Sequence, residues 1–106
     1  MRKPIARVGR LGPTTDSTYR VVVEWVVSGK KGELKEVSMT TNVFAKTLFS
    51  LTVGKEAQFS EKKIQSALML PFPENELGAG QGVTLLARSE DGTTITVDGS
   101  ITGAEE

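Results

Sequence analysis

The sequence predicts an α+β domain that is mainly β: a small five- or six-stranded antiparallel sheet, or an OB-like barrel, with one or two short helices between the third strand and a C-terminal hairpin. Three observations predict this class. Short runs of β-branched residues alternate with polar ones, and turn-forming residues separate the runs. The chain has 106 residues, which suits a single domain over 1–106 built around one core.

The strongest predicted strand covers residues 19–27. Apolar residues occupy both of its faces, so we expect it to be central, with Trp25 in the core. A glycine-bounded turn follows, and residues 33–41 supply a partner strand, so 19–41 predicts a β-hairpin. Residues 5–11 alternate loosely and predict a short first strand.

Two segments predict short helices. The first, 43–51, follows a capping residue, Asn42, and carries apolar residues at helical spacing. The second begins after Ser60, which can also cap a helix, and we expect it to end near Leu70 because a proline follows. A short strand over 53–59 is predicted between them.

The last third of the chain predicts a long loop and a hairpin. Residues 71–82 are rich in proline and glycine and predict an irregular loop. Residues 83–89 and 93–97 flank an Asp-Gly pair, which is the signal of a two-residue hairpin. Phe72 lies between two prolines in an extended segment, so it is a candidate for docking into a partner's groove; the alternative is that it folds back over the core.

The composition argues against catalysis. The chain has no cysteine and no histidine, so disulfides, thiolate metal sites and the commonest general base are excluded. We therefore expect no enzyme activity, no metal and no cofactor. The basic N-terminal stretch is not followed by an apolar run, so no signal sequence is recognised, and no run approaches the ~20 residues that span a bilayer. These features predict a soluble protein of the cytoplasm or of a virus particle, without a membrane partner.

Charge is unevenly distributed along a chain whose net charge is zero. Residues 1–63 hold twelve Lys/Arg against six Asp/Glu, a net +6, and residues 64–106 hold one against seven, a net −6. The cations either gather into a basic face for a polyanion or intermix with the carboxylates of the second half. A third arrangement is self-association, with basic surface on acidic surface.

A basic hairpin tip and an N-terminal basic arm are the candidate nucleic-acid contacts. Lysine and arginine neutralise phosphates, and an aromatic side chain at a strand start can stack on unpaired bases. The alternative interpretation is that the lysines at the hairpin tip only keep a sheet edge from pairing with another chain. The candidate residues are Arg7, Arg10, Tyr19, Arg20, Lys30, Lys31 and Lys35.

One short stretch carries a family resemblance. Val8-Gly9-Arg10-Leu11, followed by a polar loop and a valine-rich strand, resembles the opening of bacterial single-stranded DNA-binding proteins. The resemblance ends with that strand, and Gly12-Pro13 stands where this family has Asp-Pro. It implies a barrel fold and single-stranded nucleic acid as the partner.

Two functional hypotheses follow. The first is a non-catalytic binding module that contacts nucleic acid through the N-terminal arm and the basic hairpin. The alternative is a structural, assembly or protein-interaction subunit, for example of a virus, that self-associates or binds a protein partner. The arrangement of the early cations on the folded surface separates the two hypotheses.

Overall fold

The structure is a computed structural model that describes residues 3–106, with the side chains of 73–75 left aside. Its described residues form strands and one short 3-10 turn, η1 (Phe44–Lys46). The strands are β1 (Lys3–Thr14), β2 (Arg20–Val26), β3 (Lys31–Thr41), β4 (Thr47–Val53), β5 (Glu56–Lys62), β6 (Leu68–Gly78), β7 (Gly82–Ser89) and β8 (Ile95–Glu105).

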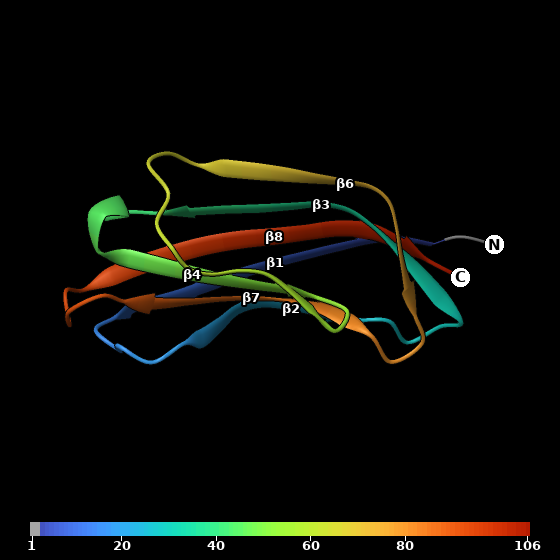
Figure 1. The fold of residues 1–106 in the computed structure, drawn as a ribbon, viewed down its shortest axis with the longest axis horizontal. Helices are drawn as coiled ribbons and strands as arrows, with labels where there is room; N and C mark the ends of the chain where they lie inside the picture. The colour runs from blue at the N-terminus through green and yellow to red at the C-terminus, as the bar shows by residue number, and fades with distance from the viewer. Residues whose placement is uncertain (1–2) are drawn as a thin grey trace.

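The strands form two four-stranded antiparallel sheets that pack face to face. One sheet has the order β1-β8-β3-β6 and the other the order β2-β7-β4-β5. Figure 1 shows these two layers. Apart from the β4–β5 hairpin, each connection carries the chain from one sheet to the other. Eight antiparallel strands wound in this way between two packed sheets form a jelly roll.

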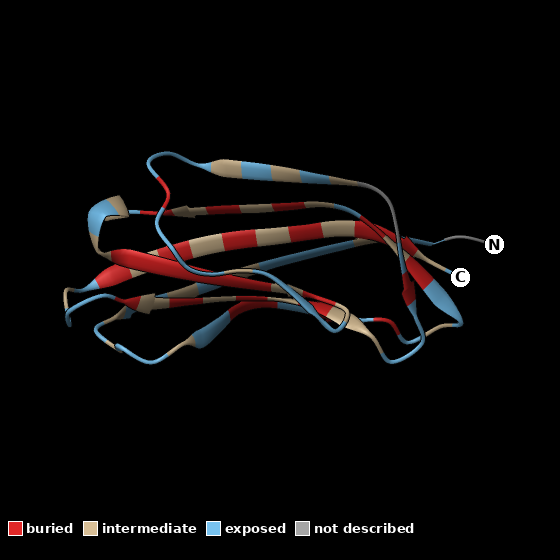
Figure 2. Cartoon of the chain, in the orientation of Figure 1, coloured by how far each residue is buried: buried red, intermediate tan, exposed pale blue. Residues whose placement is uncertain are grey.

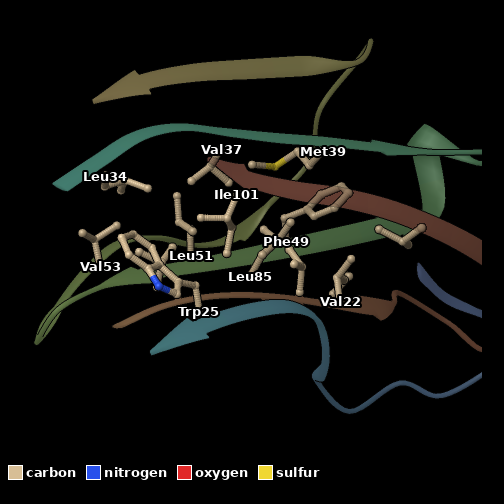
Figure 3. Close-up of a cluster of buried hydrophobic side chains, with 14 of the residues drawn as sticks. Val22, Trp25, Leu34, Val37, Met39, Phe49, Leu51, Val53, Leu85 and Ile101 are labelled. Atoms are coloured by element: carbon tan, nitrogen blue, oxygen red, sulfur yellow. The ribbon is translucent and has the colours of Figure 1, made fainter. Parts of the chain in front are cut away.

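The core lies between the sheets. Successive side chains of a strand point to opposite faces, so half-buried and buried residues alternate along β7 and along β8 as far as Gly103 (Figure 2). Aromatic and aliphatic side chains from both sheets meet in the space between them (Figure 3). The largest fully buried ones include Trp25, Phe49, Leu51, Leu85 and Ile101.

Two glycines make room for Trp25, which is 1% exposed, so its predicted core position is confirmed. A methyl group at Gly103 would lie 3.0 Å from Cζ3 of the indole, and one at Gly32 would lie 3.1 Å from Cη2. Gly103 also faces the carbonyl oxygen of Glu33 so closely that a side chain there would overlap it. The absence of side chains at these positions of β8 and β3 therefore lets the indole pack closely against the opposite sheet.

Both predicted helices are wrong. The first falls on η1 and β4, and the second on β5, the 63–67 connection and the start of β6. In β4 the residues of both faces are buried, and only Thr52 is half-buried (Figure 2). A strand covered on both faces carries a nearly continuous apolar run, which also contains apolar residues at helical spacing.

The predicted loop over 71–82 is also wrong, because β6 continues to Gly78 and only residues 79–81 connect it to β7. Proline in this segment is compatible with a strand because β6 is an edge strand. Within sheets, proline is found on edge strands, at strand starts and at bulges.

The barrel, the single open sheet and the two hairpins are contradicted by the strand pairing, while the β-rich character is confirmed. β2 pairs with β7, whereas β3 pairs with β6 and β8, so residues 19–41 are not a hairpin. Likewise, the turn at Asp91-Gly92 joins β7 to β8, which lie in opposite sheets. An Asp-Gly pair predicts that the chain reverses direction. It does not show whether the next strand pairs with the previous one or lies in the opposite sheet.

Candidate interaction surfaces

Ion pairs between the two halves of the chain neutralise much of the charge asymmetry. Four pairs among the described residues join a cation of 1–63 to a carboxylate of 64–106. They are Arg10–Asp98 at 2.7 Å, Lys31–Glu106 at 3.3 Å, Lys46–Asp91 at 2.9 Å and Lys63–Glu90 at 2.7 Å. The two halves therefore intermix within the fold.

The candidate nucleic-acid residues lie at different places on the molecule. Tyr19 and Arg20 stand at the start of β2, while Lys30 and Lys31 follow its other end. These ends are roughly 20 Å apart, because a strand rises about 3.3 Å per residue. Arg20 is paired at 2.7 Å with the carboxylate of Asp16.

The cations of β1 and β3 do not join these ends into one patch. Arg10 extends from the outer face of β1 to Asp98. Arg7 pairs in register with the buried Ile101, so it points from the edge strand toward the inner side of the sandwich, and its Nη1 donates to the carbonyl oxygen of Ala6. Lys35 occupies the irregularity in the β3 ladder between Leu34 and Glu36. The structure thus brings no continuous basic surface together from these residues.

Tyr19 forms a cluster with Glu61 and Arg88 that holds the edge strand β5. Its hydroxyl oxygen accepts a hydrogen bond of 2.8 Å from the backbone N–H of Glu61, which has a positive φ of 57°. The Arg88 guanidinium lies 5.4 Å from the Tyr19 ring centroid and donates to both carboxylate oxygens of Glu61, at 2.9 and 2.8 Å. One face of the ring is therefore occupied by an intramolecular cation–π contact.

Phe72, the candidate partner-binding residue, is half-buried in β6 and packs against the core cluster. This is the arrangement in which the aromatic side chain folds back over the core. Its packing follows from the extension of β6, whose alternate residues Leu68, Leu70 and Phe72 all contact the core.

The outer face of the β1-β8-β3-β6 sheet carries a feature that the sequence did not reveal. A row of paired residues crosses the sheet from Val8 through Ser100 and Ser38 to Met69. Val8 is 84% exposed and Met69 is 64% exposed, and the two serine hydroxyls between them are hydrogen-bonded to each other. Between these apolar ends lies a shallow hollow of about 330 Å³.

Within residues 3–106, excluding the side chains of 73–75, no three His, Cys, Asp or Glu residues come together as a metal site would require. Over the same part of the chain, no helix has the length and apolar character needed to cross a bilayer.

Comparison with solved structures finds a chain with a similar fold in a bacteriophage capsid. A chain of the cyanophage Pam1 capsid asymmetric unit superposes with a TM-score of 0.54 at 12% sequence identity, over 99% of this chain and 86% of that chain. At this identity the likeness shows a shared fold. A chain of the acid-stable capsid of Helicobacter pylori bacteriophage KHP30 matches over 98% of this chain and 93% of that chain, with 10% identity and a TM-score of 0.45. No protein-family model matches the chain, and no curated protein matches it.

Proposed function

We propose that this protein is a non-enzymatic structural subunit of a bacteriophage particle, where it packs against other protein subunits. One observation carries the proposal: the jelly roll over its whole length is shared with most of a chain in the Pam1 capsid asymmetric unit. Jelly rolls occur among viral capsid domains.

The surface chemistry supports a protein partner over a nucleic acid. Binding to a polyanion depends on Lys and Arg side chains that reach the phosphates together. Here Arg10, Arg20 and Lys31 are each paired with a carboxylate of the same chain. The row from Val8 to Met69 on the outer face of the β1-β8-β3-β6 sheet instead offers two exposed apolar side chains and no charge, as the core of a protein interface does.

Particle composition tests the proposal. Virus particles from the source of this chain are purified on a density gradient, and its peptides are quantified against those of the main shell protein by mass spectrometry. A subunit of the particle gives a fixed molar ratio across the particle fractions, and that ratio survives a high-salt wash. Absence from the particles, or a ratio that varies between fractions and falls with washing, overturns the proposal.

A further inference from the structure

We infer that a second copy of this chain packs on the outer face of the β1-β8-β3-β6 sheet, with Val8 of each copy entering the hollow of the other. The inference rests on the proposed function, since it names the surface through which the subunit meets one neighbour in the particle. It assigns a role to the exposed side chains of Val8 and Met69 and to the hollow between them.

The shape of the outer face favours a contact between two copies. Val8 is the most exposed of the large hydrophobic residues, at 84%, and it projects from the edge strand β1. Beside it, the hollow is lined by Ser38 and Ser100, whose short side chains bond to each other and leave space above them. Met69 forms the far wall. A protruding apolar side chain and a recess that accepts it therefore lie next to each other on one face, which is what a two-fold contact requires.

The charge distribution on this face is also compatible with a second copy. In a two-fold contact each surface faces its own copy, so a face of one sign would repel itself. The row that carries Val8 holds only valine, serine and methionine. In the next row, Arg10 and Asp98 cancel each other within one copy. Glu36 lies in the row on the other side, beside Pro71 on β6. The face thus suits a second copy and offers little to a polyanion.

The area of the face sets the expected strength of the contact. Four strands spaced about 4.8 Å apart, over three rows of side chains, give a face of roughly 400 Å² on each copy. This is about half of the ~800 Å² per partner in a standard stable interface. We therefore expect a weak dimer in solution, which becomes lasting in a particle where many contacts act together.

Sedimentation velocity across protein concentration tests the contact. For the unmodified chain, the dimer fraction rises between about 10 μM and 1 mM. Val8→Glu places a carboxylate in the recess of the partner, and the dissociation constant rises by at least about tenfold. The matched control is Val26→Glu, which alters a valine of the other sheet that is 53% exposed, and it leaves the constant unchanged. A chain that stays monomeric at 1 mM, or a control that weakens the dimer as much as Val8→Glu does, overturns the inference.

Cross-linking gives a second test that does not depend on a weakening variant. The chain has no cysteine, so introduced thiols are unique. When Val8→Cys protein is mixed with Ser38→Cys protein under mild oxidation, a mixed disulfide dimer forms faster than in a mixture of Val26→Cys with Ser38→Cys. Equal rates in the two mixtures overturn the inference.

The two proposals fail in different ways. If the chain is a stoichiometric particle component yet shows neither the dimer nor the Val8–Ser38 cross-link, the docking surface is wrong and the structural role stands. If the dimer and its cross-link are found but particles lack the chain, the face is a true self-contact and the capsid role is wrong.

Discussion

Arg10 on β1 donates from Nε to Oδ1 of Asp98 on β8 at a distance of 2.7 Å, although 88 positions separate the two residues in the chain. Their Cα atoms are direct partners in the β1–β8 ladder. This pair shows how the fold removes the most distinctive feature of the sequence. Strands from the cationic first half lie beside strands from the anionic second half, so a net +6 and a net −6 become adjacent surface ion pairs.

From this pairing we expect the protein not to bind single-stranded nucleic acid. Fluorescence anisotropy of a labelled oligonucleotide should show no rise at low salt, because binding depends on several unneutralised cations that act together. Binding whose affinity falls steeply with salt, and that is lost in Lys30→Glu/Lys31→Glu, would contradict this expectation. It would show that the cations act together as a nucleic-acid-binding surface.

Replacing Gly103 by alanine should destabilise the sandwich. The added methyl group would overlap the carbonyl oxygen of Glu33 and press on the indole of Trp25. We expect the free energy of unfolding to fall by about 1–3 kcal/mol, as for overpacking elsewhere. Gly78→Ala is the matched control, since its methyl group would meet only Gln81 at ordinary contact distance and should change the value by less than about 0.5 kcal/mol. Urea denaturation measures both, and equal effects would show that the close approach of the sheets at Trp25 does not limit stability.

Replacing Tyr19 by phenylalanine should loosen the edge strand β5. The ring and its contact with Arg88 remain, but the acceptor for the Glu61 N–H is lost, at a cost of about 0.5–1.5 kcal/mol. Hydrogen exchange should therefore quicken at the Glu61 amide and stay unchanged at Leu85 in the central strand β7. An unchanged rate at Glu61 would mean that the ion pair with Arg88 alone holds this segment.

Asp91 should contribute to stability only above acidic pH. Hydrogen bonds from the Thr93 hydroxyl, with those from Lys46 and the Thr93 backbone, lower the pKa of Asp91 to about 2. Because the pKa in the folded state lies below the unfolded value of about 3.9, the stabilisation is complete above pH ~4 and is lost as the pH falls toward 2. NMR titration of the side-chain carboxyl gives the midpoint directly, and the stability difference between the unmodified chain and Asp91→Asn should shrink over the same interval. A midpoint near 4 would show that these hydrogen bonds do not persist in solution.

Local patterns in the sequence predicted much of the β structure but could not predict which strands pair. The strand at 19–27 was recognisable because its valines and Trp25 occupy both faces, and it became β2. Asn42 and the apolar spacing behind it predicted a helix, yet the Asn42 side-chain oxygen accepts a hydrogen bond from Thr96 N–H instead of capping a turn. Thr96 belongs to β8 and lies 54 positions away in the chain, so the local sequence around Asn42 does not contain it.

The candidate surface was beyond sequence reasoning for the same reason. The sequence predicts a strand that includes Val8, but the loose alternation of residues 5–11 does not show which of its faces is covered. The exposure of Val8 depends on Ser100 being its partner on the outer face, and the recess beside it depends on Ser38 lying across the sheet. The resemblance to single-stranded DNA-binding proteins likewise described one strand and its loop, which occur in both a barrel and a sandwich.

The edges of the first sheet limit how copies of this subunit can be joined. β1 and β6 are its outer strands, and an open strand invites a neighbouring molecule to extend the ladder indefinitely, as in amyloid fibres. β6 carries Pro71 and β1 carries the inward-facing Arg7, two devices that discourage such strand addition. In the proposed particle, these two devices would direct association away from endless ribbons and toward contacts between broad surfaces, which permit a finite, closed shell.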